Sequence, residues 1–196
     1  MRNIAIFASG SGTNAENIIE YFSTKNSAKV TLVLSNKRNA MVLKRAENYN
    51  VKTVFFERDD FYLSGKVLDC LLLHKTDFIV LAGFLWLVPE TIIEIFHRRI
   101  INIHPALLPG YGGKGMYGEA VHKAVIENRE TESGITIHYV NKQYDEGDII
   151  FQARCRVDPA DNADTLAGKI HALEYLHFPR VIDEIVSKLS DFGSGC

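Results

Sequence analysis

The sequence has no block of like charge and no apolar run long enough to cross a membrane. Its 22 basic and 24 acidic residues leave a formal net charge of −2, so we expect no large nucleic-acid footprint. The longest apolar stretch, Phe78 to Pro89, is shorter than the roughly 20 residues that span a bilayer and is interrupted by Gly83. These absences predict small molecules as partners, with no nucleic acid and no membrane.

The sequence also has few cysteines and lacks a secretory pattern. Cys70, Cys155 and Cys196 are isolated from one another, which is typical of reduced thiols rather than a disulfide framework or a zinc site. No histidines have the spacing of an H-E-x-x-H motif, so we expect no metal. Met1 to Gly12 contain no apolar segment before a small-residue cleavage site, and we therefore expect a cytoplasmic protein.

Short apolar runs alternate with amphipathic ones along most of the chain. Five runs have the composition of buried strands: 3–9, 29–36, 51–57, 78–84 and 99–104. Patterns of helical period lie between them, such as Ile18, Ile19 and Phe22. Such alternation predicts right-handed crossovers and a mainly parallel sheet with helices on both faces.

The last third of the chain changes character. Residues 134–140 and 148–157 are two strand-like runs separated by a turn, so we expect them to pair antiparallel. Apolar residues then recur at helical spacing in a long final helix, which Pro179 should break or kink. We therefore predict one domain over residues 1–196, with an α/β three-layer Rossmann-like fold, a mainly parallel sheet, an antiparallel strand pair and a long C-terminal helix.

The segment ASGSGTNAENI follows the first strand and opens the first helix. Gly10 and Gly12 let the backbone approach a ligand closely, Thr13 and Asn14 can cap the helix, and a helix amino terminus attracts phosphate. The segment lacks the third glycine of a dinucleotide fingerprint and the lysine of a P-loop. It indicates either a monophosphate site or an ordinary turn with a helix cap.

Asn102 and His104 end the fifth strand. Alternate residues of a strand share a face, so both side chains point the same way. An amide N–H and an imidazolium N–H could together hold the oxygen of a tetrahedral intermediate whose nucleophile comes from a substrate. A carboxylate should orient the ring and stabilise its charge. Asp145 in the turn QYDEGDII is the first candidate, with Glu146 and Asp148 as rivals.

The other histidines and the LWLVP segment are weaker indications. His138 lies on a strand near the proposed site, but it is a less favoured candidate than His104. Four more fall on predicted helices as surface or packing residues: His74, His97, His122 and His171. The apolar segment Leu85 to Pro89 is either ordinary core or one wall of a slot for a flat aromatic ligand.

Four motifs together resemble the formyl-tetrahydrofolate transferase family. They are SGSGTN after the first strand, VLAGFLWLVP after the fourth, NIHPALLPGYGG after the fifth and the late YDEGDII. The opening motif and the short length resemble the members that act on glycinamide ribonucleotide. The resemblance implies transfer of the formyl group of 10-formyltetrahydrofolate, a co-substrate, to the amine of 5′-phosphoribosylglycinamide in de novo purine biosynthesis.

By position, the resemblance also implies roles for individual residues. The catalytic trio is matched by Asn102, His104 and Asp145. The implied nucleotide site consists of Gly12, Thr13, Asn14 and Glu174. The implied folate pocket consists of Leu85, Leu87, Val88 and Asn102. The bond between Leu108 and Pro109 corresponds to a cis peptide in the family.

Two departures from the family pattern leave roles open. The family often has arginine where this chain has Leu85-Trp86, and the glycine-rich segment 110–118 differs from that of relatives. For the substrate phosphate or the folate tail, Arg58 and Lys66 are candidate basic residues. Two alternatives to the implied function are a related formyltransferase acting on methionyl-tRNA or a sugar nucleotide, and a nucleotide-binding module without catalysis.

Overall fold

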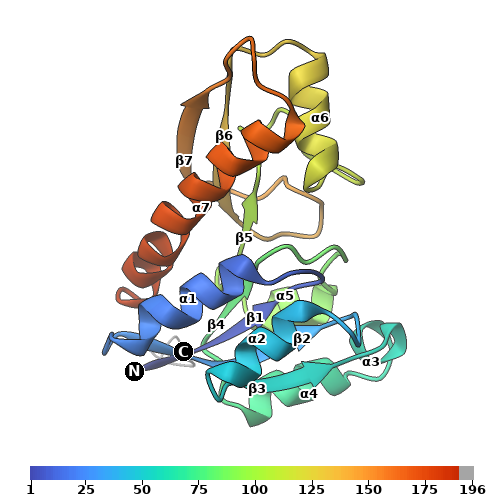
Figure 1. The fold of residues 1–196 in the computed structure, drawn as a ribbon. Helices are drawn as coiled ribbons and strands as arrows, with labels where there is room; N and C mark the ends of the chain where they lie inside the picture. The colour runs from blue at the N-terminus through green and yellow to red at the C-terminus, as the bar shows by residue number, and fades with distance from the viewer. Residues whose placement is uncertain (190–196) are drawn as a thin grey trace.

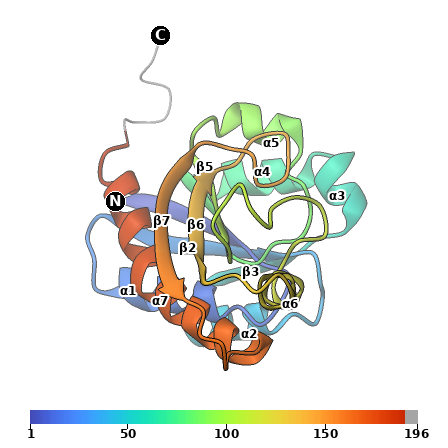
Figure 2. The ribbon, with the colours of Figure 1, turned by 90° about the horizontal axis from the view of Figure 1, so that it is seen from above.

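The computed structural model describes residues 1–189, which form a seven-stranded sheet between two layers of helices (Figures 1 and 2). The strands are β1 (Arg2–Phe7), β2 (Ala28–Ser35), β3 (Lys52–Phe55), β4 (Phe78–Leu81), β5 (Ile100–His104), β6 (Glu132–Tyr139) and β7 (Ile149–Arg156). The helices are α1 (Thr13–Ser23), α2 (Met41–Asn48), α3 (Arg58–Tyr62), α4 (Lys66–Leu73), α5 (Glu90–Ile95), α6 (Glu119–Glu127) and α7 (Ala163–Val186).

The strand order is β3-β2-β1-β4-β5-β6-β7. Strands β1 to β5 are parallel, whereas β6 pairs antiparallel with β5 and β7 pairs antiparallel with β6. The chain therefore builds the sheet outward from β1 to β3 and then crosses to β4 on the other side. In sheets of this kind, ligands bind beyond the carboxyl ends of the strands where the order reverses. The predicted fold class, including the antiparallel pair, is confirmed.

Alternate residues of β1 enter two separate cores. Ile4 and Ile6 pack with apolar residues of α1, α2, α6 and α7, whereas Ala5 and Phe7 pack with those of α3, α4 and α5. Figure 2 shows these two sets of helices on opposite sides of the sheet. Because the central strands are buried on both faces, they read as continuous apolar runs rather than alternating ones.

Strand β4 is shorter than the sequence predicted. It ends at Leu81 instead of residue 84, because the backbone turns at Gly83 with a φ of 75°. Ser9 N–H donates to the Gly83 carbonyl at 2.9 Å, which ties this turn to the loop after β1. The turn carries the LWLVP segment out of the sheet and beside the end of β5.

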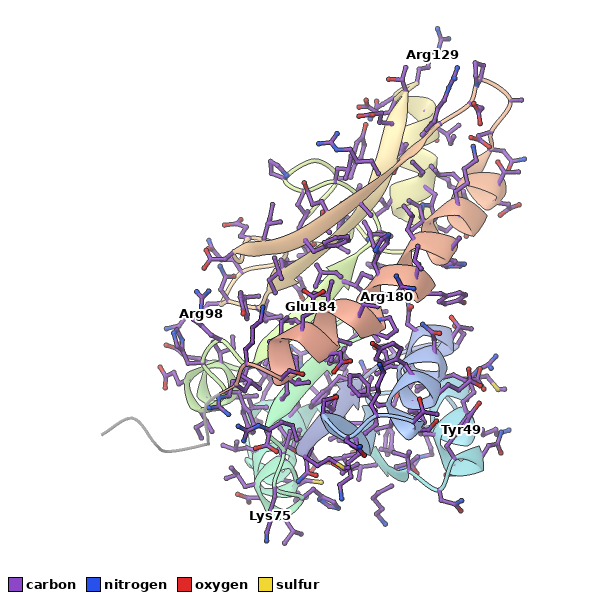
Figure 3. The ribbon with its side chains drawn as sticks, turned by 90° about the vertical axis from the view of Figure 1, so that its left-hand side faces the viewer. Tyr49, Lys75, Arg98, Arg129, Arg180 and Glu184 are labelled. Atoms are coloured by element: carbon purple, nitrogen blue, oxygen red, sulfur yellow. The ribbon has the colours of Figure 1, made fainter. Side chains whose placement is uncertain are left out.

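Helix α7 continues through Pro179, so the break, one of the two expected effects of this proline, does not occur. A proline in a helix leaves the carbonyl four residues earlier without its usual N–H donor. Here that carbonyl belongs to Tyr175, and the Asn17 side-chain amide of α1 donates to it at 3.0 Å. Figure 3 shows α7 extending from the β6–β7 end of the sheet past α1, with Arg180 and Glu184 labelled along it.

The structure also bears on the cysteines and on the peptide bond before Pro109. Cys70 and Cys155 are free thiols, and Cys196 lies outside the described residues. The peptide bond between Leu108 and Pro109 is cis, as the resemblance implied. Among residues 1–189, no helix has the length and apolar character needed to span a bilayer, and no cluster of three His, Cys, Asp or Glu side chains could hold a metal ion.

Gly134 and Gly168 offer a matched pair of substitutions that tests the packing of β6. A Cβ on Gly134 would clash with the Ala153 carbonyl of β7, whereas a Cβ on Gly168 in α7 would meet open space. We expect Gly134→Ala to lower the free energy of unfolding by about 1–3 kcal/mol. Gly168→Ala should raise it by roughly 0.5–1 kcal/mol, because alanine favours helix. Urea denaturation measures both, and equal effects would contradict this packing.

Candidate active site

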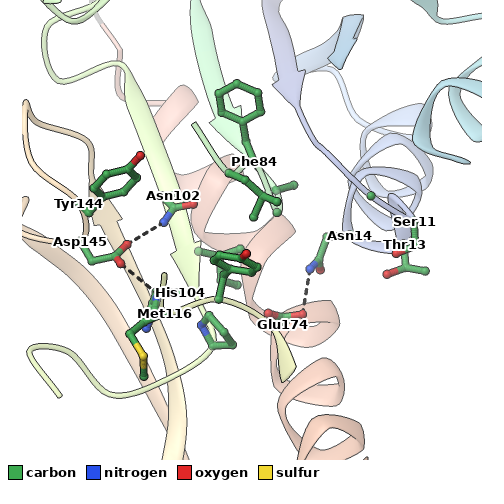
Figure 4. Close-up of a pocket in the computed structure, with 18 of the residues that line it drawn as sticks. Ser11, Thr13, Asn14, Phe84, Asn102, His104, Met116, Tyr144, Asp145 and Glu174 are labelled. Carbon is green, nitrogen blue, oxygen red and sulfur yellow. Dashed lines mark hydrogen bonds and ion pairs between the residues drawn. The ribbon is translucent and has the colours of Figure 1, made fainter. Parts of the chain in front are cut away.

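A cleft of about 650 Å³ lies at the carboxyl ends of β1, β4 and β5 (Figure 4). The loops after these strands, the segment 114–118 and the loop between β6 and β7 form its walls. Helix α7 contributes His171 and Glu174, and α6 contributes His122. The cleft therefore occupies the point where the strand order reverses between β1 and β4, which is the usual ligand position in such a sheet.

The glycine loop after β1 forms one end of the cleft. Gly12 caps α1 in the left-handed conformation, with a φ of 78°, and a Cβ on it would overlap the Val42 side chain. Glycine is therefore required for this loop to pack against α2. Thr13 and Asn14 form the first turn of α1 and line the cleft. The backbone N–H groups and the positive dipole end of this turn suit a phosphate.

Asn14 and Glu174 connect α1 to α7 at the cleft wall. The Asn14 amide nitrogen donates to Glu174 Oε2 at 2.8 Å (Figure 4). Glu174 is only 6% exposed, and burial raises the pKa of its carboxyl. The other end of the amide, Asn14 Oδ1, is buried without a hydrogen-bond partner. The structure thus brings together Asn14 and Glu174, which the resemblance assigned to the nucleotide site. Asn14 Oδ1 remains as an acceptor without a hydrogen-bond partner.

Asn102, His104 and Asp145 meet in the middle of the cleft. His104 Nδ1 lies 3.5 Å from Asp145 Oδ2, and Asn102 Nδ2 lies 3.4 Å from Asp145 Oδ1. The loop after β6 brings Asp145 over the end of β5 with a left-handed φ of 58°. Of the two rival carboxylates, Glu146 is exposed and Asp148 pairs with Arg98 at 2.8 Å. Only Asp145 among these three acidic residues faces the histidine.

Burial opposes a charged His104 more strongly than its neighbours favour it. The imidazole is 3% exposed, and burial lowers its pKa although Asp145 and the Tyr111 carbonyl act to raise it. Burial also acts to raise the pKa of Asp145, but contacts with His138, His104 and the Gly113 N–H bring that pKa below its usual value. Asp145 is therefore an ionised carboxylate. Both nitrogens of the His104 ring face acceptors, Asp145 Oδ2 and the Tyr111 carbonyl, which favour the charged ring against the effect of burial.

The glycine-rich segment 110–118 covers the catalytic pair. The Tyr111 carbonyl lies 2.7 Å from His104 Nε2, and Gly113 N–H donates to Asp145 Oδ2 at 3.0 Å. A carbonyl oxygen can only accept, so His104 Nε2 carries a hydrogen. The same segment supplies Lys114, which is the one Lys or Arg among the described residues that line the cleft.

The loop after β4 lines the apolar side of the cleft. Leu85 borders the main cleft, whereas Leu87 and Val88 line a small cavity of about 40 Å³ on the other side of Asn102. Trp86 borders both spaces. Apolar walls with a few polar groups at one end suit a flat aromatic ligand.

Trp86 stands at the edge of a cluster of aromatic rings. Its ring centre lies 6.1 Å from those of Phe56 and Tyr62, and the Arg58 guanidinium lies 5.7 Å from it. The second candidate cation, Lys66, instead pairs with Asp60 at 2.8 Å. Trp86 therefore places an aromatic surface, backed by Arg58, beside the cleft.

His138 has a larger part in the site than its sequence position indicated. It is 2% exposed, and its Nε2 lies 3.1 Å from Asn102 Nδ2 and 3.5 Å from Asp145 Oδ1. The antiparallel register places it directly opposite Asn102. His122 and His171 also line the cleft rather than serving only as packing or surface residues. The pairing register of β5 and β6 was the signal that could have identified His138.

Residues 2–182 match the family model described as formyl transferase. The chain is 34% identical over 191 residues to phosphoribosylglycinamide formyltransferase of Bacillus subtilis, with 95% of each chain covered. It is 37% identical over 190 residues to the chloroplastic phosphoribosylglycinamide formyltransferase of Arabidopsis thaliana. That match spans 94% of this chain but 65% of the plant protein.

Solved structures show the same fold. Phosphoribosylglycinamide formyltransferase from Bacillus halodurans has a TM-score of 0.85 and 34% identity, covering 95% of this chain and 96% of that one. The enzyme of the same name from Anaplasma phagocytophilum has a TM-score of 0.87 and 32% identity, covering 95% and 87%. By sequence and by structure, the chain belongs to the formyl transferase family.

Proposed function

We propose that this protein transfers the formyl group of 10-formyltetrahydrofolate to the primary amine of 5′-phosphoribosylglycinamide in de novo purine biosynthesis. The observation that carries the proposal is one cleft containing both a phosphate-type helix terminus and the group Asn102, His104 and Asp145. An amide and an imidazole of this kind can hold a tetrahedral oxyanion, but the nucleophile must come from a second substrate. The relatives named above carry the name of this activity.

The two ends of the cleft suggest how the substrates lie. We assign the ribonucleotide phosphate to Gly12, Thr13 and Asn14, and the sugar hydroxyls to the nearby Glu174 carboxyl and the unused Asn14 Oδ1. The folate ring system would lie against Leu85 and Trp86 in the cleft and extend toward Leu87 and Val88, which line the adjoining small cavity. This arrangement brings the amine and the formyl group together at Asn102 and His104.

The reaction begins when the amine nitrogen attacks the formyl carbon. A carbon–nitrogen bond forms, and negative charge develops on the formyl oxygen. His104 Nε2–H is the donor that we assign to this oxygen. In the free protein this N–H is held by the Tyr111 carbonyl, so the formyl oxygen must replace that carbonyl. The tetrahedral intermediate then breaks its bond to the folate nitrogen, which takes up the proton lost by the amine.

We also propose the wider setting of this activity. Residues 1–196 act as one domain, 10-formyltetrahydrofolate is a co-substrate rather than a resident cofactor, and no metal takes part. The partners are the two small molecules, without nucleic acid or membrane, because the formal net charge is only −2. We expect the protein in the cytoplasm.

The acceptor is tested by incubating the protein with 10-formyltetrahydrofolate and one of three amines. We expect deformylated folate to appear with glycinamide ribonucleotide, and not with methionyl-tRNA or an amino-sugar nucleotide. The absorbance change of the released folate follows the reaction. Formyl transfer to either of the other acceptors, or none to the ribonucleotide, would reject the proposed function.

His104→Ala removes the proposed oxyanion donor. We expect kcat to fall on the order of 10²- to 10³-fold, because one preorganised donor is lost. Binding of the ribonucleotide, measured by calorimetry, should change little, since its phosphate site lies at the other end of the cleft. His97→Ala, on an exposed residue, is the matched control and should keep full activity. A His104→Ala enzyme with near-normal turnover would refute the assignment.

Asp145→Asn tests the electrostatic coupling between the Asp145 carboxylate and the His104 imidazole. The carboxylate acts to raise the pKa of His104 against the larger effect of burial. Its removal should therefore lower the His104 pKa further, and NMR titration of the ring proton measures the shift. The pKa of His177, which burial and Arg180 lower, should not move. An unchanged or higher pKa at His104 would contradict the coupling.

A further inference from the structure

His138 packs directly behind the Asn102 side chain. Its Nε2 lies 3.1 Å from Asn102 Nδ2, and its Nδ1 lies 2.8 Å from the carbonyl oxygen of Tyr139. The ring is 2% exposed and is held on β6 opposite Asn102. Nε2 also lies 3.5 Å from Asp145 Oδ1, so Asn102 Nδ2 is the nearer polar neighbour of Nε2, and the Tyr139 carbonyl is the neighbour of Nδ1.

These neighbours indicate which nitrogen of His138 carries the hydrogen. A backbone carbonyl only accepts, so Nδ1 must donate to Tyr139. In the neutral ring, the other nitrogen, Nε2, then has a free lone pair. Asn102 Nδ2 is the nearest donor to that lone pair. His138 thus holds the amide nitrogen of Asn102 through its Nδ1–H tautomer.

Asp145 supports the same orientation of the Asn102 amide. A reversed amide would place Asn102 Oδ1 where Nδ2 now lies, 3.4 Å from Asp145 Oδ1. Two acceptor oxygens would then face each other, and Asp145 is ionised because its pKa is lowered. Figure 4 shows the amide nitrogen turned toward Asp145 and the amide oxygen turned away from it. Asn102 therefore presents Oδ1, an acceptor, to the cleft.

We propose that His138 is a positioning residue that orients Asn102 so that Asn102 Oδ1 accepts a hydrogen bond from the attacking amine. This inference rests on the proposed function, since it concerns the nucleophile of that reaction. It also revises the expectation that Asn102 and His104 both donate to the formyl oxygen. His104 contacts the oxygen, and Asn102 contacts the nitrogen.

The division of roles follows the charges that develop in the reaction. As the amine attacks, positive charge grows on its nitrogen while negative charge grows on the formyl oxygen. A hydrogen bond from the amine to Asn102 Oδ1 becomes charge-assisted in the transition state, and it turns the nitrogen lone pair toward the formyl carbon. An amide nitrogen at the same position would repel the developing cation.

Two substitutions of His138 separate its two hydrogen bonds. His138→Asn keeps a donor near Nδ1 for the Tyr139 carbonyl but loses the acceptor for Asn102. His138→Gln keeps an acceptor near Nε2 but loses the donor to Tyr139. We expect His138→Asn to lower kcat by about tenfold, the value of one ordinary hydrogen bond, with little change in KM. His138→Gln should lose less activity, although thermal unfolding should show that it is the less stable variant.

A double-mutant cycle tests whether His138 acts through Asn102. In an Asn102→Ala background, His138→Asn should cause no further loss of kcat. The proposal is overturned if His138→Asn slows this background by the same factor as the wild type. It is also overturned if activity follows stability, with His138→Gln slower than His138→Asn, because that order indicates a purely structural role.

NMR of the histidine-labelled protein gives a test that does not need the reaction. Long-range proton–nitrogen spectra should show that the neutral His138 ring carries its hydrogen on Nδ1, and a neutral ring with its hydrogen on Nε2 would overturn the proposal. If the wild-type protein fails to formylate the ribonucleotide, the proposed function fails. The spectra still report separately on the orientation of Asn102.

Discussion

The geometry of the cleft depends on one buried carboxylate. Asp145 lies within 3.5 Å of His104, His138, Asn102 and the backbone N–H of Gly113. Burying a charge is unfavourable unless polar groups surround it, and these contacts offset that cost. They come from β5, from β6 and from the segment after β5, so the same charge that organises the catalytic group also connects three parts of the chain.

Much of the fold could be predicted because burial on both faces of a parallel sheet leaves a local signature. The centre of the sheet consists of apolar runs such as residues 4–7 in β1 and Phe78–Leu81 in β4, and helical spacing fills the intervals between the strands. What could not be predicted depended on contacts between distant residues. The Asn17 amide compensates the carbonyl that Pro179 leaves unpaired, and the turn at Gly83 ends β4 early. The first of these contacts joins α1 to α7, and the turn at Gly83 is tied to the loop after β1 by a backbone hydrogen bond to the Gly83 carbonyl.

The candidate site also contains residues that could be predicted from the sequence and residues that could not. Asn102 and His104 could be placed together because two alternate residues of one strand must share a face. Asp145 was the first candidate in its turn, but Glu146 and Asp148 stayed open as rivals until the resemblance was considered, because spacing within a turn does not tell which carboxylate points inward. His138 was undervalued since its importance comes from the β5–β6 register. The burial that lowers the pKa of His104 could not be predicted either, because the degree of burial is a property of the folded chain.

The central claim is that His104 Nε2 releases the Tyr111 carbonyl and donates to the formyl oxygen. A crystal structure with glycinamide ribonucleotide and an unreactive analogue of the formyl donor tests it most directly. The account predicts a distance of about 2.7–3.1 Å between His104 Nε2 and the formyl oxygen, with the Tyr111 carbonyl displaced. A complex in which both ligands are bound while Tyr111 still occupies Nε2, and the formyl oxygen lies elsewhere, would contradict it.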